Sequence, residues 1–261
     1  YTTLFRSVDD VMKMDECDTR RKVRPSQGVH LVVDSKFLGG RSALMIPKTK
    51  DGRVLFGVPW HGKVVLGTTD TPLNEASLEP RALEEEVDFI LDQAGQYLDR
   101  KPTRADVLSI FAGLRPLAAP THADSKKTKE ISRNHKIYRS KSGLLTITGG
   151  KWTTYRAMAE DVINQAIVIG GLSPAECVTK NLRVHGYTKE QFDENDWNYV
   201  YGSDADKIQK MIEKEPSFAE KLYEGYTFTA AHVVWAAREE FAQNIEDVLA
   251  RRVRMLFLDA R

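Results

Sequence analysis

The sequence predicts an α+β fold, in which a mostly antiparallel sheet with one covering helix is followed by an all-helical C-terminal domain. Up to about Gly150 the chain carries short runs rich in Val, Leu and Ile, separated by Gly, Pro, Lys and Asp, a pattern typical of antiparallel strands. From Lys151 onward the apolar residues follow helical spacing. With 261 residues, 41% of them hydrophobic, the chain can bury a sizeable core, and its length favours two subdomains over one.

One helix interrupts the strands in the first part of the chain. It is expected over residues 79–98, with Pro80 near its first turn and glutamates at 84–86, where a helix start favours negative charge. Its apolar residues lie on one side, so we expect it to cover one face of the sheet. The strands are expected at residues 28–34, 43–47, 53–60, 63–70, 106–117 and 143–149.

The remainder of the chain is predicted to form helices over 157–169, 204–214, 230–241 and 245–257. We place a domain boundary after residue 170, between a first part (8–170) and a C-terminal part (171–261). Residues 1–7, YTTLFRS, match the translation of a common sequencing adapter and are expected to be non-native. The last residues stop inside a helical pattern without a capping glycine or a proline, so we expect a fragment.

Charge and cysteine content narrow the class of function. Lys and Arg number 38 and Asp and Glu 37, and a chain so nearly neutral has no strong field for nucleic acid, so no nucleic-acid partner is expected. Cys17 and Cys177 are far apart and lack metal-like spacing, so we expect a reducing compartment and no metal site. No stretch approaches the roughly 18 apolar residues of a spanning helix, which predicts a soluble or peripheral protein.

The stretch TITGGKWTTYR, residues 146–156, leads from a strand through Gly149 and Gly150 into a helix. Amides at a helix start lack partners, and glycines let a ligand approach closely, so this turn favours a negatively charged group. A nucleotide P-loop is excluded, because it needs Gly at position 145 and Ser or Thr at 152, where the chain has Leu145 and Trp152. The alternative is that the glycines only allow a tight corner, with Lys151 solvated.

Four stretches fit one family pattern: PSQGVHLVVD, VPWHGKVVLGTTDTPL, FAGLRPL and SRNHKIYRSKSGLLTITGGKWTTYRAMAEDV. In order and spacing they resemble the FAD-dependent glycerol-3-phosphate dehydrogenases, the quinone-linked enzymes of bacteria and mitochondria, over about residues 8–259. The N-terminal half of that family carries a GxGxxG motif, which the chain lacks. The resemblance therefore implies the C-terminal portion of an FAD-dependent oxidoreductase, with 8–170 as its substrate-binding part and 171–261 as a truncated helical cap.

The resemblance also implies the reaction. The enzyme of this family oxidises sn-glycerol 3-phosphate to dihydroxyacetone phosphate, uses FAD as cofactor and passes electrons to quinone, in glycerol metabolism. The fragment alone is expected to be inactive. Two alternatives stay open: a glycerol-3-phosphate oxidase of the same fold that uses oxygen, and a non-catalytic substrate-binding or interaction module.

Two cations are candidates for catalysis and substrate binding. Arg115 ends a strand just before Pro116, and its fork of donors suits a phosphate dianion. By resemblance it contacts the substrate; the alternative is an edge arginine paired to a surface carboxylate. Lys151 stands at a helix start, an unfavourable place for a cation unless an anion is also present, so it is expected to face the flavin or the phosphate.

His30 is the candidate proton acceptor and a further substrate-binding residue. If the odd-numbered residues of GVHLVVD face the core, His30 faces the opposite surface, and the resemblance places a histidine there beside the substrate. His61 and His135 are expected to be structural or at the surface, and His135 and Arg133 are secondary candidates for lining the substrate pocket. The cofactor-binding candidates are Gly149, Gly150, Lys151, Trp152 and Thr153, the last three through amides aimed at the flavin N1/O2 edge.

Residues 126–141 carry seven Lys or Arg against one Glu. Such a run is commonly a solvated hairpin, and the alternative is a peripheral contact with anionic headgroups of a membrane. A homodimer stays open as a further partner. The expected location is cytoplasmic, with peripheral attachment to the cytoplasmic membrane face as the alternative.

Overall fold

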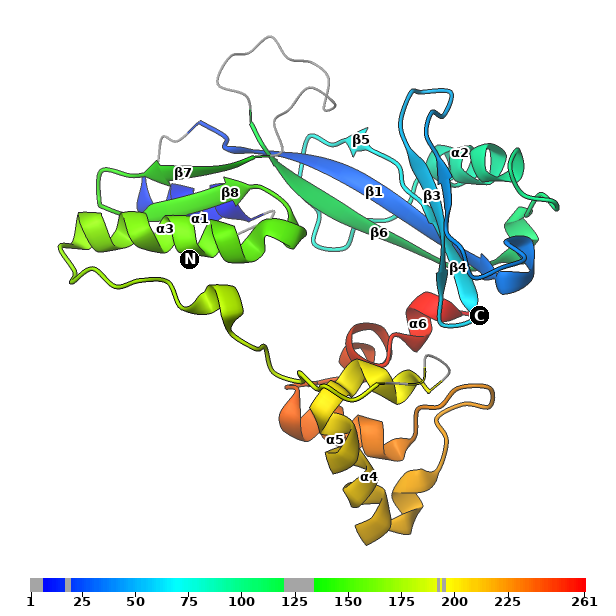
Figure 1. The fold of residues 1–261 in the computed structure, drawn as a ribbon. Helices are drawn as coiled ribbons and strands as arrows, with labels where there is room; N and C mark the ends of the chain where they lie inside the picture. Colours follow the sequence, from blue (N-terminus) through cyan, green and yellow to red (C-terminus); the bar gives the residue numbers. More distant parts are fainter. Residues whose placement is uncertain (1–6, 17–19, 120–133, 192, 194–195) are drawn as a thin grey trace.

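The computed structural model describes residues 7–261 except 17–19, 120–133, 192 and 194–195 (Figure 1). Its main sheet has the order β2-β3-β4-β1-β5, and β6 also pairs with β1. All of these pairs are antiparallel, as the sequence predicts. The strands are β1 (Val23–Asp34), β2 (Leu44–Ile46), β3 (Leu55–Trp60), β4 (Lys63–Gly67), β5 (Thr71–Pro72) and β6 (Val107–Ala118).

Helix α2 (Glu84–Gly95) covers one face of this sheet (Figure 1). The prediction of a helix from residue 79 is wrong at its start, because the chain turns into the helix only at Leu83, whose amide donates to Glu86 Oε2 (3.0 Å). Each aliphatic side chain buried here contributes about 1.5–3 kcal/mol. The buried core between helix and sheet contains Val29, Leu31, Val33, Leu66, Val87, Ile90, Leu91 and Ala94.

The strand predicted at 143–149 is present as part of a hairpin that forms a second, separate sheet, and the sequence predicts neither its partner strand nor the separation. Strand β7 (His135–Arg139) pairs antiparallel with β8 (Leu145–Gly149). Helix α3 (Tyr155–Gly170) packs on it through Met158 and Val162 against Ile147. Helix α1 (Val8–Asp15) is a further element that the sequence reading leaves out, and its buried Val8 and Met12 cluster with Val23.

The mixed α+β class is confirmed, but an all-helical C-terminal domain is not. Helices α4 (Ala205–Lys214) and α5 (Ala230–Glu239) share a core, yet the chain also makes an isolated antiparallel bridge between Lys221 and Thr229. The remaining helical pieces are short: 3₁₀ turns at Thr179–Asn181, Trp197–Asp204 and Pro216–Ala219, a π-helical segment at Asp247–Arg252, and α6 (Met255–Leu258).

The continuous helix predicted over 245–257 is wrong. Arg254 adopts a left-handed backbone conformation (φ 57°) between the π-helical segment and α6. A non-glycine residue rarely takes this conformation, and it ends the helix there. Within the π-helical segment Arg251 pairs with Asp247 (3.0 Å), whereas Arg252 pairs with Glu240 (3.4 Å).

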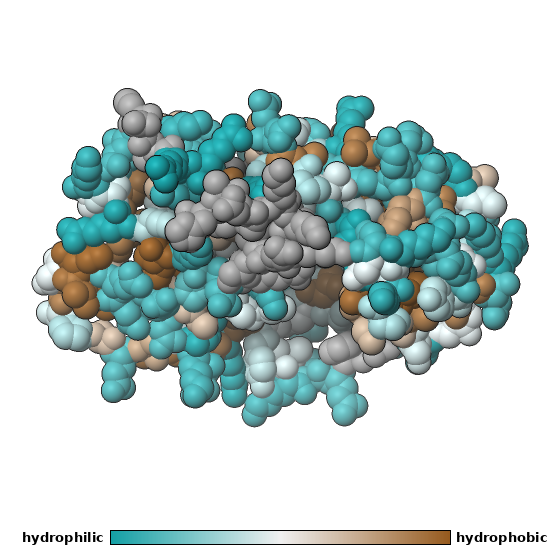
Figure 2. Space-filling view, turned by 90° about the horizontal axis from the view of Figure 1, so that it is seen from above, coloured by the Kyte–Doolittle hydropathy of each residue, from teal (hydrophilic) through white to brown (hydrophobic). Residues whose placement is uncertain are grey.

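The C-terminal residues return to the main sheet. Ala260 donates its amide to the Leu108 carbonyl (3.0 Å), and Phe257 meets Phe111 edge-on with ring centroids 4.9 Å apart. Seen from above, the surface is mostly hydrophilic with scattered hydrophobic patches (Figure 2). Among the described residues, no helix combines the length and the apolar character that crossing a membrane requires.

Candidate functional site

His30 lies on the face of the main sheet that points away from α2. Its neighbours on β1, Val29 and Leu31, belong to the core under that helix, as the alternation predicts. In the strand register His30 stands between Gly67 of β4 and Phe111 of β6. The imidazole stacks on Phe111 (centroids 5.1 Å apart, planes at 16°), and a β-carbon on Gly67 would collide with it. The glycine therefore makes the room that the half-buried imidazole occupies.

Arg115 lies on the same face, on β6. Its Nη1 donates to the Thr69 carbonyl (3.0 Å) and its Nη2 to Thr68 Oγ1 (2.9 Å). Its Nη1 also lies 3.7 Å from Asp70 Oδ1. Because the Asp70 side chain is only 14% exposed, the alternative of an edge arginine paired to a surface carboxylate does not describe this residue. The guanidinium is instead held by the segment that connects β4 to β5.

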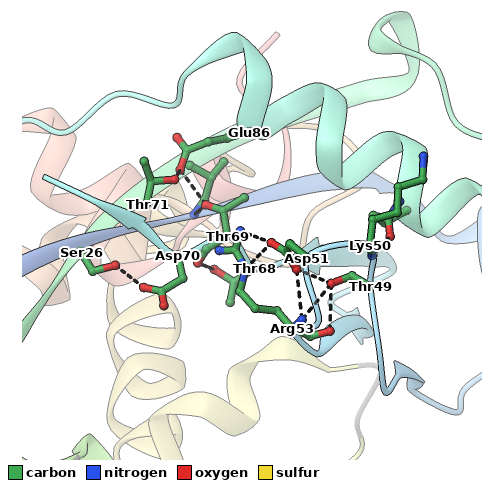
Figure 3. Close-up of polar contacts among 12 residues, drawn as sticks. Ser26, Thr49, Lys50, Asp51, Arg53, Thr68, Thr69, Asp70, Thr71 and Glu86 are labelled. Carbon is green, nitrogen blue, oxygen red and sulfur yellow. Dashed lines mark hydrogen bonds and ion pairs between the residues drawn. The ribbon is translucent and has the colours of Figure 1, made fainter. Parts of the chain in front are cut away.

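The side chain of Arg115 reaches back over the strand toward His30. Ser26 and Arg115 are register partners, as are Gly28 and Gly113, so all four stand on the face that carries His30. A β-carbon on Gly28 would collide with the guanidinium. Ser26 Oγ donates a hydrogen bond to Asp70, which holds the segment between β4 and β5 against β1 (Figure 3). Sequence reasoning missed Gly28, Thr68 and Ser26, and only the GTTD tetrapeptide could have drawn attention to this segment.

The two groups interact electrostatically. Burial lowers the pKa of His30 below its ordinary value of 6.5, and the positive charge of Arg115 lowers it further. The imidazole is therefore neutral at pH 7 and has a lone pair that can accept a proton. A neutral base beside a guanidinium is an arrangement that can bind an anionic alcohol and take the proton of its hydroxyl.

The turn of Gly149 and Gly150 has a structural explanation of its own. Both glycines have positive φ, 75° and 76°. A β-carbon on Gly149 would lie 2.8 Å from the Asn134 carbonyl oxygen, and one on Gly150 would collide with Met158. Close packing thus requires both glycines without any ligand, and their role in cofactor binding stays a prediction.

The residues after the glycines are open to solvent. Lys151, Trp152 and Thr153 are exposed, and Trp152, 77% exposed, stacks on Tyr155 with centroids 5.6 Å apart. A 3₁₀ turn (Trp152–Thr154) leads into α3. An accessible helical turn that carries an indole and an ammonium can bind a group that takes up negative charge, such as the edge of a flavin.

The structure brings this turn to the strand that carries Arg115. Gly149 abuts Ala118, and a β-carbon on Gly149 would lie 3.1 Å from Ala118 Cβ. Ala118 follows Arg115 by three positions on β6, about 10 Å along the strand, and because three is an odd number the side chain of Ala118 points to the opposite face. Lys151 follows two positions after Gly149. Arg115 and the glycine turn therefore lie near the same end of β6, with the turn packed on the face opposite to Arg115.

Of the other candidates, His135 lies beside the glycine turn as the register partner of Gly149, and His61 lies elsewhere. Arg133 falls outside the described residues. His135 Nε2 lies 2.7 Å from Asp161 Oδ2, and His61 packs among Trp60, Trp197 and Tyr199 at the tip of the β3–β4 hairpin, which is the structural role expected for both histidines. Among the residues that the structure covers, no group of three His, Cys, Asp or Glu side chains is placed to hold a metal ion.

Known proteins share both the sequence and the fold. A mitochondrial glycerol-3-phosphate dehydrogenase of Arabidopsis thaliana is 40% identical over 281 residues, covering 96% of this chain and 44% of that protein. A mitochondrial glycerol-3-phosphate dehydrogenase of Bos taurus is 36% identical and covers 97% of this chain and 37% of its own length. The chain thus spans less than half of these relatives.

A solved structure supports the same grouping. The glycerol-3-phosphate dehydrogenase of Bacillus halodurans, complexed with FAD, superimposes with a TM-score of 0.79 at 29% identity, over 97% of this chain and 53% of that one. The model of the C-terminal domain of alpha-glycerophosphate oxidase matches residues 145–261. The model of the FAD dependent oxidoreductases matches residues 7–156, more than half of the chain. The chain therefore belongs to the FAD-dependent oxidoreductases, among the relatives of the glycerol-3-phosphate dehydrogenases.

Proposed function

We propose that the full-length product of this gene oxidises sn-glycerol 3-phosphate to dihydroxyacetone phosphate with FAD and passes the electrons to quinone. The observation that carries the proposal is the pair of His30 and Arg115 on one face of the sheet, a neutral base beside a guanidinium. The relatives named as glycerol-3-phosphate dehydrogenases support the substrate class. The FAD-complexed structural neighbour supports the cofactor.

Each residue has a defined task in this proposal. Arg115 binds the anionic substrate. Two acceptors hold the plane of its guanidinium, the hydroxyl of Thr68 and the carbonyl of Thr69. His30 accepts the proton of the secondary hydroxyl group while the carbon–hydrogen bond at the same carbon is broken. FAD, when bound, supplies the acceptor for the hydride from that carbon.

The exposed turn after Gly150 is assigned to the cofactor side of the site. The amides of Lys151, Trp152 and Thr153 stand at the start of a helical stretch and favour negative charge. The ammonium of Lys151 adds positive charge at the same place, toward the flavin or the substrate phosphate.

The experiment is an activity assay on the purified full-length protein with sn-glycerol 3-phosphate. We expect substrate-dependent reduction of a soluble quinone analogue and formation of dihydroxyacetone phosphate. A flavin-containing protein that reduces no acceptor and forms no ketone with this substrate would overturn the proposal and favour a non-catalytic binding module.

A second function, an oxygen-dependent oxidase, is favoured by one observation. The family model that matches residues 145–261 is that of the C-terminal domain of alpha-glycerophosphate oxidase. The same assay in air separates the two. A dehydrogenase gives little hydrogen peroxide and a fast reaction with the quinone analogue, whereas an oxidase gives peroxide in step with the ketone.

The 261-residue chain by itself is proposed to bind no FAD and to be inactive, because it lacks a GxGxxG motif and spans less than half of its relatives. Purified chain is expected to be colourless. A yellow preparation with a flavin absorption band contradicts this part of the proposal.

Partners and location stay proposals as well. The basic stretch 126–141, of which residues 126–133 lie outside the described residues, is proposed to contact anionic headgroups at the cytoplasmic membrane face. Salt-sensitive binding of the full-length protein to vesicles with anionic lipid supports this. Binding unchanged by charge reversal at Lys126, Lys127 and Lys129 contradicts it. A homodimer is proposed as the assembly, and sedimentation of the full-length protein tests it.

A further inference from the structure

Glu86 is a buried carboxylate in the first turn of α2. Its side chain faces the sheet, and the residue is only 5% exposed. Oε1 accepts hydrogen bonds from Thr69 Oγ1 (2.7 Å) and Thr71 Oγ1 (2.6 Å), as Figure 3 shows. Oε2 accepts from Gln27 Nε2 (2.7 Å) and from the Leu83 amide (3.0 Å). Each oxygen therefore has two donors, and the carboxylate is fully hydrogen-bonded.

These hydrogen bonds decide the charge of the group. Burial alone raises the pKa of Glu86, but the bonds from Thr71, Leu83, Thr69 and Gln27 lower it below its ordinary value of 4.5. Glu86 is thus ionised at neutral pH, and hydrogen bonds to a charged acceptor are about twice as strong as neutral ones. An ionised carboxylate in this position holds the two threonines firmly.

Thr69 links Glu86 directly to Arg115. Its hydroxyl donates to Glu86 and accepts from the Val29 amide (3.0 Å). Its carbonyl accepts from Arg115 Nη1 (3.0 Å). Thr68 and Asp70, on either side of it, supply the other contacts of the guanidinium. A displacement of Thr69 would therefore carry the acceptors of Arg115 with it.

A role in starting the helix accounts for only one of these bonds, the one that Glu86 Oε2 accepts from the amide of Leu83 at the N-cap of α2. Glu84 and Glu85 stand in the same turn and are exposed, where they interact with the positive end of the helix just as well. Glu84 pairs with Arg104 at the surface (2.6 Å). Glu86 differs from both, because its Oε1 also reaches across to the connection between β4 and β5, which has no part in forming the helix.

We propose that Glu86 is a positioning residue for substrate binding: through Thr69 and Thr71 it fixes the connection that orients the Arg115 guanidinium. This inference rests on the proposed function, in which Arg115 binds the anionic end of the substrate. A shift of about 1 Å in such a group is enough to cost a large factor in rate or affinity.

The test compares Glu86→Gln with Glu85→Gln in the full-length protein, because both changes remove one charge from the same helical turn. We expect kcat/KM for sn-glycerol 3-phosphate to fall on the order of tenfold in Glu86→Gln, mostly through KM, with unchanged flavin content. Glu85→Gln is expected to behave as wild type. Thr71→Val, which removes one donor to Glu86 at a half-exposed position, is expected to show a smaller loss in the same direction.

A double-mutant cycle separates positioning from a general structural effect. If Glu86 acts through Arg115, then adding Glu86→Gln to Arg115→Ala changes kcat/KM by no more than about twofold. If the double variant loses kcat/KM by the product of the two single losses, the inference is overturned. A Glu86→Gln protein with the KM of wild type would also overturn it. Wild-type protein that does not oxidise the substrate overturns the proposed function instead, and that result is seen before any variant is made. If Glu86→Gln does not fold, the same cycle with Thr71→Val decides.

Discussion

The imidazole of His30 stacks on the ring of Phe111, its register partner on β6, with centroids 5.1 Å apart. Phe111 lies two positions before Gly113 on the same strand. This contact buries the imidazole on the face that Arg115 also occupies. The pKa of His30 is lowered by that burial first and by the charge of Arg115 second.

Removing the charge of Arg115 is therefore expected to raise the pKa of His30 toward 6.5. The change is Arg115→Gln, and the measurement is an NMR titration of the histidine ring protons. Arg254→Gln is the matched control, because Arg254 lowers the pKa of His61 in the same way. Arg254→Gln should shift the pKa of His61 and leave the pKa of His30 unchanged. An unaltered His30 titration in Arg115→Gln would show that the two groups do not interact.

The space above Gly28 is expected to be necessary for the position of Arg115. Gly28→Ala places a methyl group where the guanidinium lies, and a flexible side chain moves more easily than backbone. We expect the thermal midpoint to change little while KM for the substrate rises about tenfold. Gly113→Ala, at the register partner, is the control, since a β-carbon there meets nothing within 4 Å. Equal KM values for the two variants contradict the placement of Arg115.

His61 is expected to stabilise the contact between the β3–β4 hairpin and the C-terminal region. It has a left-handed backbone (φ 45°), and its ring lies 4.8 Å from Trp197 and 6.0 Å from Tyr199. His61→Asn keeps a residue that tolerates this backbone and removes ring contacts worth about 1 kcal/mol.

Phe241 provides the control for that change. It has the same kind of backbone (φ 58°) but is 84% exposed, so Phe241→Asn should leave the free energy of unfolding nearly unchanged. Hydrogen exchange of residues 197–204 should increase in His61→Asn alone. Equal exchange in both variants would contradict a docking role for His61.

The protein is expected to lose stability in mild acid. The pKa of His232 is lowered from 6.5, by burial above all, and its residue is 1% exposed. Its Nδ1 accepts from the Thr229 amide (2.9 Å) and its Nε2 lies 2.7 Å from Asn198 Oδ1. Both contacts require the neutral imidazole that carries its proton on Nε2.

Because the folded pKa lies below the unfolded one, the unfolded chain binds more protons, so this stabilisation is complete above pH 6.5 and is lost as the pH falls below it. The free energy of unfolding, measured with urea at several pH values, should decrease below pH 6.5, and less steeply in His232→Gln. A variant with the same slope as wild type would rule out this residue as a source of the effect.

Local pattern predicts much of the fold and part of the site. Alternation in GVHLVVD predicts both the strand and the outward direction of His30, because a strand has a period of two. The apolar side of α2 likewise predicts Val87 and Ile90 as buried. These features depend on neighbours within a few positions of the sequence.

The remaining features depend on contacts between distant segments. Arg115 is held by Thr68 and Thr69, more than 40 positions earlier in the chain, and no local pattern indicates which segment crosses it. The break at Arg254 carries no glycine or proline, so the sequence reads as one helix where the structure has two pieces. The tight packing behind Gly149 and Gly150 also explains why a glycine pair alone does not identify a cofactor site.

The most direct test of the central claim is the rate of anaerobic flavin reduction by sn-glycerol 3-phosphate in the full-length protein, compared among wild type, Arg115→Ala and Lys151→Ala. We expect saturable bleaching in wild type, a large rise in the half-saturating substrate concentration in Arg115→Ala, and a slower reduction step in Lys151→Ala. If the Arg115→Ala protein has the same half-saturating substrate concentration as wild type, the claim that this face of the sheet binds the substrate is contradicted.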